Sequence, residues 1–231
     1  MKLRFFCCSM ACALVMGMGQ SAAAQASKGE PGPPAADHAA TTYRAPAADR
    51  APAAYHGGLV TPPIPKPRFT LTDTAGAPFD LQAKTQGSVT LLFFGYTHCP
   101  DMCPLQMNMI ARAVKTLPAA VQSQFIVVFI TTDPERDTPQ VLRSWLDHFD
   151  KRFIGLTGSL AAVEAAQLAA KIAPAKKSPV RSDGAYEVGH AAFVFAYTKD
   201  NLAHVIYPVG LGSEDWMHDL PLLANEQWTS H

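Results

Sequence analysis

Cys99 and Cys103 are the residues of this sequence best suited to chemistry. The other three cysteines, Cys7, Cys8 and Cys12, lie within the first twelve residues, so this pair stands alone in the rest of the chain. Two cysteines so close together cannot join distant parts of a fold as a disulfide framework does. We therefore interpret them as a working pair, able to form a disulfide with each other or to share one metal ion.

The spacing of the two cysteines places both sulfurs on one side of a helical turn. Residues four apart on a helix have Cβ atoms about 5–6 Å apart, and a turn partly unwound at Pro100 brings the sulfurs closer. A position at the start of a helix stabilises a thiolate, because unpaired backbone N–H groups point toward it. Thiolates are soft ligands that select Cu(I), with Zn(II) as the main competitor.

Two sulfurs leave a metal site incomplete, and His190 is our candidate for the third ligand. It opens an apolar strand and is flanked by Gly189 and Ala191, whose small size leaves room for an imidazole. A hydrogen-bonded structural role for His190 stays open, and His98 is a competing ligand that would have to bend back sharply. The weaker candidates are three thioethers and several histidines that we expect to be solvated: Met102, Met107, Met109, His38, His56, His148, His204 and His218.

The elements around the cysteines predict an α/β fold. An apolar strand over residues 89–94 leads directly into the cysteine segment, and a helix follows it with Leu105, Met109 and Ile110 on its buried face. Further elements are expected in this order: a strand over 125–130, a helix opened by Thr138 and Pro139, a helix over 159–172, a hairpin of 190–197 with 202–207, and a helix over 214–223. This order predicts a single thioredoxin-like domain, with a central mixed sheet and helices on both faces.

The first 67 residues differ in composition from the rest. Lys2 and Arg4 precede an uncharged apolar run and then small residues that fit a signal-peptidase site, so we predict a signal peptide over 1–26. An uncleaved membrane anchor is the alternative, although the run is shorter than the roughly 20 residues that span a bilayer. Residues 27–67, rich in Ala and Pro, predict a disordered linker, and residues 68–226 the domain. We expect an exported protein, in the periplasm or on the outer face of the inner membrane.

The charge balance excludes one class of partner. The chain has 19 basic and 19 acidic residues, and therefore a formal net charge of zero. Proteins that bind nucleic acid carry a basic surface that neutralises phosphates. We accordingly expect no nucleic-acid partner.

Two motifs resemble those of a known family. The segment Phe94–Pro104, FGYTHCPDMCP, resembles the signature of the Sco/SenC family, the copper proteins of cytochrome c oxidase assembly. The segment Asp133–Pro139, DPERDTP, is similar to that family's second marker, and His190 falls where the family's metal-binding histidine lies. The resemblance covers about residues 69–223, nearly all of the part expected to be ordered.

The resemblance implies a fold, a ligand and a partner. It implies a thioredoxin-like domain that binds one copper ion, as Cu(I) or Cu(II), through Cys99, Cys103 and His190. It further implies delivery to the binuclear copper centre of the oxidase, with the copper-receiving subunit or another copper chaperone as partner. The family often has an acidic residue before the histidine and a hydroxyl residue after it. Here Gly189 and Ala191 stand at those positions, so a hydrogen-bond partner of the imidazole is expected to be lost.

Other functions fit the same cysteines. A thiol–disulfide oxidoreductase would cycle Cys99 and Cys103 between dithiol and disulfide, and would reduce cysteines of the metal-free oxidase subunit or of other exported proteins. A thiol peroxidase is disfavoured, because no hydroxyl residue and arginine are clearly arranged about a lone cysteine. Asp133 has two interpretations that stay open: it closes a turn after a strand, or it lines the site.

Overall fold

The computed structural model describes residues 55–225 and Trp228. The helices in this part of the chain are α1 (Leu81–Lys84), α2 (Met102–Thr116), α3 (Ala119–Gln122), α4 (Pro139–Asp147), α5 (Leu160–Ala169) and α6 (Ser213–Asn225). The strands are β1 (Gly58–Pro65), β2 (Thr70–Asp73), β3 (Pro78–Asp80), β4 (Val89–Gly95), β5 (Phe125–Thr131), β6 (Ile154–Thr157), β7 (Lys176–Lys177), β8 (Val188–Gly189), β9 (Phe193–Tyr197) and β10 (Leu202–Pro208). The expected signal peptide and most of the expected linker lie outside the described residues.

The central sheet is mixed, as expected. Its strand order is β1-β10-β9-β4-β5-β6-β2-β3, and β7 pairs with β8 in a separate two-stranded sheet. The neighbours β4, β5 and β6 run parallel, while β9 runs antiparallel to β4. Gly95 pairs with Thr131, so the carboxyl ends of β4 and β5 lie side by side. The segments that follow these two strands therefore meet at one end of the sheet.

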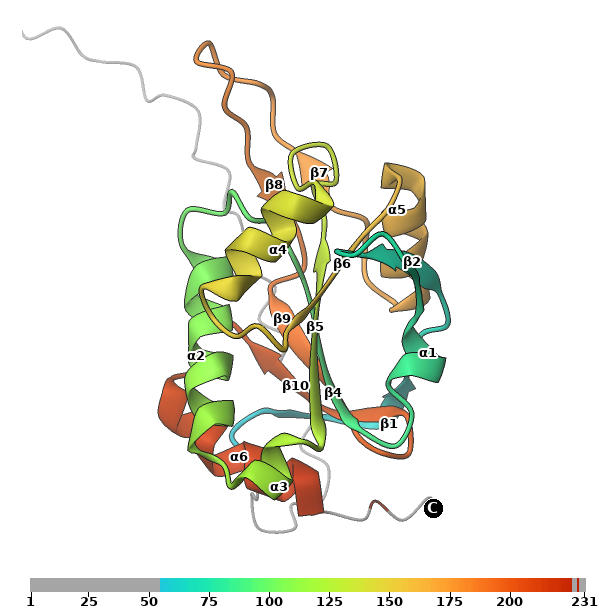
Figure 1. Cartoon of the computed structure of the whole chain (residues 1–231), viewed down its shortest axis with the longest axis vertical. Helices are drawn as coiled ribbons and strands as arrows, with labels where there is room; N and C mark the ends of the chain where they lie inside the picture. The colour runs from blue at the N-terminus through green and yellow to red at the C-terminus, as the bar shows by residue number, and fades with distance from the viewer. Residues whose placement is uncertain (1–54, 226–227, 229–231) are drawn as a thin grey trace, which may run out of the picture. The chain divides into compact units, whose positions relative to one another are not determined.

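Helices cover both faces of the sheet, which confirms the predicted fold class. Along the fully buried β4, Leu91 and Phe93 belong to one hydrophobic cluster and Leu92 and Phe94 to the other. The first cluster includes buried side chains of α2, α4 and α6, and the second those of α1 and α5. Figure 1 shows α2 and α4 on one side of the central strands and α5 and α1 on the other. Because both faces of β4 are covered, every position along it is buried, and its sequence is a near-continuous apolar run.

The start of α4 agrees with the expectation from sequence, whereas the buried face of α2 differs from it at one position. Thr138 Oγ1 accepts a hydrogen bond from the N–H of Val141 at 3.3 Å, with Pro139 in the first turn of α4. On α2, however, Leu105 is exposed and Met107 is fully buried, so the expected apolar face was wrong at its first position. The buried positions repeat from Cys103 at helical spacing, and Leu105 points to the opposite side.

Regular structure is present before the expected domain boundary at residue 68. β1 pairs antiparallel with β10 inside the segment assigned to the linker, which is a correction to that assignment. Pro62, Pro63 and Pro65 favoured a linker, but β1 is an edge strand, where a missing N–H on the unpaired side costs nothing. Beyond β1, buried Lys66 donates hydrogen bonds to the hydroxyls of Thr85 and Thr90, each at 3.0 Å.

We expect the start of the domain to show in truncated chains. A chain that begins at Tyr55 should unfold at nearly the same temperature as the longer protein. A chain that begins at Arg68 loses β1 and the Lys66 contacts, each hydrogen bond contributing about 0.5–1.5 kcal/mol. Its free energy of unfolding should fall by at least about 2 kcal/mol, and its Tm by about 4–8 °C. Equal melting temperatures in calorimetry would show that β1 is dispensable.

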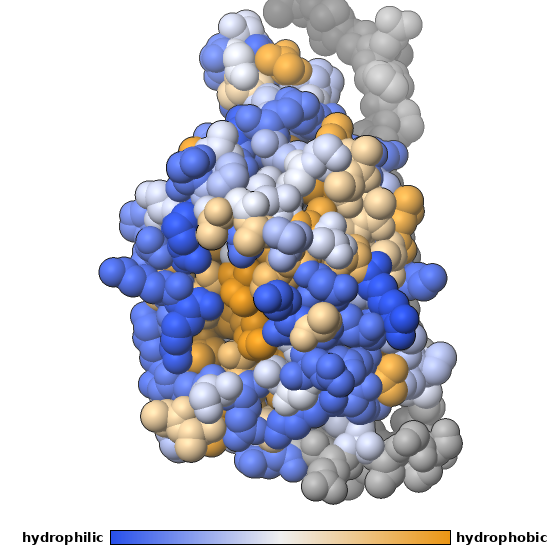
Figure 2. All heavy atoms as spheres, turned by 45° about the vertical axis from the view of Figure 1, so that its right-hand side comes forward, coloured by the Kyte–Doolittle hydropathy of each residue, from blue (hydrophilic) through white to orange (hydrophobic). Residues whose placement is uncertain are grey.

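Apolar side chains also reach the surface, notably on α5. Leu160 is 42% exposed and Leu168 is 59% exposed. Figure 2 shows apolar side chains gathered in the upper part of the face that includes α5, beside polar side chains. Among the described residues, none of the helices has both the length and the apolar character needed to cross a membrane.

Candidate metal centre

Strand β4 carries the chain to the cysteines at the end of the sheet. The segment after Gly95 turns back, with the N–H of Cys99 donating to the carbonyl of Tyr96 at 3.3 Å, and α2 begins at Met102. Gly95 is required by this close approach, since a Cβ there would lie 2.9 Å from Cys103 Sγ and 2.9 Å from the Phe129 ring. The strand end, the turn and the helix start thus hold both sulfurs at one place.

The two cysteines are not joined by a disulfide in this structure, and they have different environments. Cys99 is half-buried and Cys103 is fully buried. The thiol of Cys103 donates a hydrogen bond to Cys99, which with backbone N–H groups of residues 101–103 lowers the pKa of Cys99 to about 5. The same hydrogen bond, followed by burial, raises the pKa of Cys103 far above its usual range. Cys99 is therefore the thiolate and Cys103 the thiol in the metal-free protein at neutral pH.

The structure brings His190 to Cys103. Nε2 of His190 lies 3.5 Å from Cys103 Sγ, and its ring packs edge-on against Phe93 and Tyr96. Nδ1 lies 2.9 Å from the carbonyl oxygen of Ala191. Because a carbonyl only accepts hydrogen bonds, Nδ1 carries the proton and the lone pair of Nε2 faces the sulfur. His190 lies in the segment between β8 and β9 and does not open a strand, which corrects that detail of the expectation.

A backbone carbonyl serves as the hydrogen-bond partner of the His190 imidazole, in place of the side-chain partner whose loss the sequence predicts. Gly189 and Ala191 offer no side-chain acceptor, but the carbonyl of Ala191 orients the imidazole. A metal-binding histidine commonly donates its second ring N–H to a carboxylate or to a backbone carbonyl. The orientation of His190 is therefore preserved without an acidic neighbour.

Asp137 holds the segment that leads to Cys99. Its carboxylate is fully buried and accepts hydrogen bonds from the N–H of Thr97 at 2.9 Å and from the hydroxyl of Thr97 at 2.6 Å. The hydroxyl of Thr131, at the end of β5, donates to the same carboxylate at 2.6 Å. Asp137 thus ties the cysteine segment to the end of the neighbouring strand.

Asp133 supports the other side of the site, the segment that leads to His190. Asp133 is fully buried, forms an ion pair with Arg136 and accepts a hydrogen bond from the hydroxyl of Tyr186 at 2.9 Å. The guanidinium of Arg136 stacks on the Tyr186 ring, 3.6 Å from its centroid. Tyr186 lies two residues before β8, and His190 directly follows that strand. These contacts favour the structural interpretation of Asp133, and Tyr186 is a supporting residue that no sequence motif marked.

The other candidate ligands lie in different surroundings. Nδ1 of His98 lies 3.1 Å from the hydroxyl of Thr97 and 3.5 Å from Asp137, and its side chain is 49% exposed. Met107 is buried in the core, and His204 stacks on Trp228. The remaining described candidates are half-buried or exposed: Met102, Met109, His56, His148 and His218.

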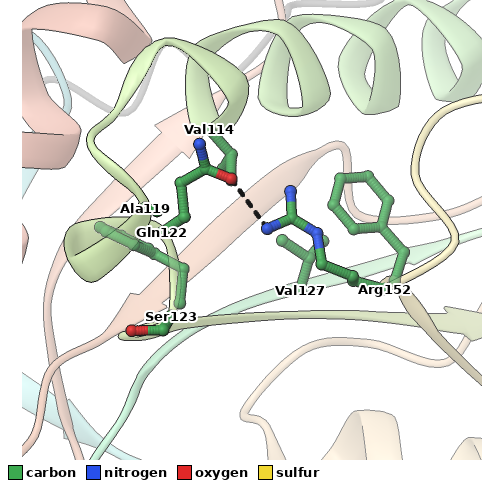
Figure 3. A pocket seen from close by; sticks show the side chains of 8 residues that line it. Val114, Ala119, Gln122, Ser123, Val127 and Arg152 are labelled. Carbon is green, nitrogen blue, oxygen red and sulfur yellow. Dashed lines mark hydrogen bonds between the residues drawn. The ribbon is translucent and has the colours of Figure 1, made fainter.

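A cavity of about 340 Å³ lies away from the cysteines. It opens near Phe125 at the start of β5, whereas the cysteines follow the carboxyl end of the parallel strand β4. Figure 3 shows Arg152 reaching toward Gln122, with Nη1 donating to Oε1 at 2.8 Å. Its lining residues are Val114, Ala119, Gln122, Ser123, Phe125, Val127, Arg152 and Phe153. No residue of the predicted site contributes to it.

The donor atoms at the cysteines fit a soft metal ion. Two sulfurs and one imidazole nitrogen form a set that Cu(I) and Zn(II) prefer over Mg²⁺ or Ca²⁺. Full burial of Cys103 limits access of water to that sulfur, while Cys99 remains reachable from outside. The arrangement suits an ion that must be held and later released.

The difference between the two thiols predicts their reactivity. In the metal-free protein, alkylation of Cys99 by iodoacetamide should be constant from about pH 6 to 9, because its pKa is about 5. The rate should fall only as the pH drops through 5, where the thiolate becomes protonated. Cys103 should react much more slowly. Cys103→Ala removes the donor and should move the Cys99 profile to higher pH, as peptide mapping would show. A rate that rises through pH 8–9 would mark Cys99 as an ordinary thiol.

Comparison with known proteins identifies the family. Residues 61–224, well over half of the chain, match the model of the SCO1/SenC family. The SCO2-like protein of Rickettsia prowazekii is 35% identical over 132 residues, covering 57% of this chain and 63% of that protein. The mitochondrial SCO2 protein of Saccharomyces cerevisiae is 33% identical, covering 55% of this chain and 42% of that protein. The alignments with these curated relatives thus span less than two thirds of the relatives' own length.

Solved structures agree in fold. Apo Sco1 from Thermus thermophilus superposes with a TM-score of 0.65 at 33% identity, covering 73% of this chain and 96% of that one. Bradyrhizobium japonicum ScoI, solved with copper bound, gives a TM-score of 0.61 at 32% identity and covers 69% of this chain and 99% of that one. With the family model matching most of the described domain, the chain belongs to the SCO1/SenC family.

Proposed function

We propose that this protein is a copper metallochaperone that binds one copper ion through Cys99, Cys103 and His190. The observation that carries the proposal is the 3.5 Å approach of His190 Nε2 to Cys103 Sγ, with Nδ1 fixed by a backbone carbonyl. Family membership supports the choice of copper, since a relative 32% identical has been solved with copper bound. Two thiolates and an imidazole serve Cu(I), and the imidazole makes the set usable for Cu(II) as well.

We propose the binuclear copper centre of cytochrome c oxidase as the destination. The resemblance of the two motifs to proteins of oxidase assembly supports this assignment, and the copper-receiving subunit or another copper chaperone is the partner that it implies. The half-buried Cys99 is the sulfur that an incoming ligand of the recipient can reach first. Transfer through exchange of ligands at Cys99 would leave Cys103 and His190 to release the ion last.

A second candidate function is favoured by the two unequal thiols. Cys99 as thiolate would attack a disulfide of a target and form a mixed disulfide. Cys103 would then lose its proton and attack the Cys99 sulfur, which forms the Cys99–Cys103 disulfide and releases the target as a dithiol. The low pKa of Cys99 suits the first step. The mixed disulfide removes the Cys99 thiolate, whose hydrogen bond is the main cause of the raised pKa of Cys103, so Cys103 then gives its proton to the departing target thiolate more readily.

The two functions are separated by His190, which only the chaperone needs. The copper-loaded protein is mixed with the metal-free soluble domain of the oxidase subunit, and the absorption of the binuclear centre is followed. In parallel, the reduced protein is mixed with the same domain in its disulfide form, and the thiols formed are counted. For a chaperone, His190→Ala should abolish efficient copper transfer. Unimpaired transfer by His190→Ala, together with efficient reduction, would favour the oxidoreductase.

We further propose export, on the evidence of the predicted signal peptide at residues 1–26. The same segment would attach the protein to the outer face of the inner membrane if it is retained. Mass spectrometry of the protein recovered from the periplasm would distinguish the two forms. A full-length mass in the cytoplasmic fraction would contradict export.

A further inference from the structure

Two histidines meet at the junction of β1 and α6, away from the cysteines. His56 lies two residues before β1 in the region expected to be a linker, and His218 lies on α6. Their rings stack with centroids 4.2 Å apart and an interplanar angle of 9°. Both side chains are exposed, by 45% for His56 and 46% for His218. The pair is therefore ordered by its neighbours and accessible from solution.

Each of these imidazoles is held by its own carboxylate. Nδ1 of His56 lies 2.6 Å from Asp215 Oδ1, and Nδ1 of His218 lies 2.7 Å from Asp219 Oδ1. Pairing of one ring nitrogen with a carboxylate is typical of histidines that bind a metal ion. Here two such pairs stand side by side.

The two carboxylates are themselves fixed by backbone N–H groups. Asp219 is fully buried, and its Oδ2 accepts hydrogen bonds from the N–H groups of His56 and Gly57, each at 2.9 Å. Asp215 Oδ2 accepts a hydrogen bond from the N–H of Gly212 at 2.7 Å. This bond and the contact with His56 hold the pKa of Asp215 below its usual range. The Asp219 carboxylate is therefore fixed in position beside both rings.

We propose that His56, His218 and Asp219 form a second metal site, which takes a divalent ion of the Zn(II) or Cu(II) class. One nitrogen from each ring and one oxygen of Asp219 already lie within 4.8 Å of one another. The ligand atoms around an ion bound at about 2.0–2.2 Å lie roughly 3 Å apart. To reach this separation, the exposed imidazoles of His56 and His218 turn from their stacked arrangement toward Asp219. Asp215 stays outside the ligand set and orients His56 through Nδ1, and the two carboxylates balance the charge of a divalent ion.

The ligand types separate this site from the cysteine centre. Imidazole and carboxylate donors suit Cu(II) and Zn(II), whereas the thiolates of Cys99 and Cys103 suit Cu(I). In the sheet, β10 and β9 stand between β1 and β4, the strand that leads to the cysteines. The second site does not rest on the proposed chaperone function, and it is tested in a chain that lacks both thiols.

The test uses the whole chain with all five cysteines, Cys7, Cys8, Cys12, Cys99 and Cys103, replaced by serine. Zn(II), Cu(II) and Cu(I) are titrated separately by calorimetry, and the Cu(II) form is examined by electron spin resonance. We expect one Zn(II) or Cu(II) per chain, nitrogen hyperfine structure from imidazole, and much weaker binding of Cu(I). His56→Gln and His218→Gln should each lower the Zn(II) affinity by at least about 10–100-fold, because each removes a direct ligand.

The matched control is His148→Gln. His148 is exposed, and its Nδ1 lies 3.2 Å from the carbonyl oxygen of Trp145. Its replacement should leave the affinity unchanged. A second measurement guards against misfolding of the thiol-free variant and uses a chain that keeps Cys99 and Cys103, with only Cys7, Cys8 and Cys12 replaced by serine. Its Zn(II) stoichiometry should be two per chain and fall to one in His218→Gln. Absence of Zn(II) and Cu(II) binding, or equal affinity in His56→Gln, His218→Gln and His148→Gln, would overturn the proposal.

Discussion

Replacement of His190 by alanine is expected to abolish the Cu(II)–thiolate absorption of the copper-loaded protein while some Cu(I) stays bound. Cys99 and Cys103 alone can hold Cu(I) with near-linear coordination, but Cu(II) prefers additional nitrogen or oxygen ligands in a tetragonal arrangement. The affinity for Cu(II) should fall at least about 10–100-fold, the range found when a group that merely orients a ligand is removed. Absorption and spin-resonance spectra, recorded with a Cu(I) competition titration, measure both effects.

The fold should survive this substitution, which keeps the result interpretable. His190 is half-buried, and its ring contacts Phe93 and Tyr96 edge-on without filling the core. His98→Ala is the control, because His98 is next to Cys99 in sequence but lies near Thr97 and Asp137. If His98→Ala removed the Cu(II) spectrum and His190→Ala left it intact, the assignment of the third ligand would be wrong.

The cysteine side of the site could be predicted from sequence because local rules govern it. A continuous apolar run identifies β4, and the residues that follow such a strand reach the end of the sheet. Pro104 lies in the first turn of α2, and a spacing of four residues places Cys103 about one helical turn after Cys99. The start of α4 was predictable for the same reason, since Thr138 and Pro139 act within their own turn.

Contacts between distant segments carried no such signal. Tyr186 meets Asp133 and Arg136 across some fifty positions, and neither its type nor its neighbours mark it as a support for His190. The carbonyl of Ala191 orients the imidazole through the backbone, which every residue offers equally. Sequence reasoning could name the proposed ligand but not the groups that hold it in place.

Proline content misled the assignment of β1 because composition does not reveal position in a sheet. The same prolines would break a central strand, yet β1 pairs on one side only. Folding of this segment depends on Asp219 of α6, which binds the N–H groups of His56 and Gly57. One sequence alone does not indicate that a carboxylate far along the chain accepts hydrogen bonds from the two residues that precede β1.

Replacement of Asp137 by alanine is expected to destabilise the protein by about 3 kcal/mol or more and to weaken copper binding. The N–H of Thr97 and the hydroxyls of Thr97 and Thr131 would lose a buried anionic acceptor, and a hydrogen bond to a charged group contributes about 1.5–3 kcal/mol. Urea unfolding of the metal-free protein measures the first effect, and Cu(I) and Cu(II) competition titrations the second.

The loss of affinity should be about 10–100-fold, because Asp137 holds the segment that carries Cys99 without being a proposed ligand itself. Asp101→Ala is the matched control: Asp101 precedes α2 in the same segment, is exposed and makes no side-chain hydrogen bond to cap the helix. It should change stability by less than about 0.5 kcal/mol. If Asp137→Ala lost stability but bound copper as tightly as the unaltered protein, the carboxylate would support the fold alone. Loss of both, with Asp101→Ala unaffected, would show that the buried carboxylate positions the outer thiolate for the metal.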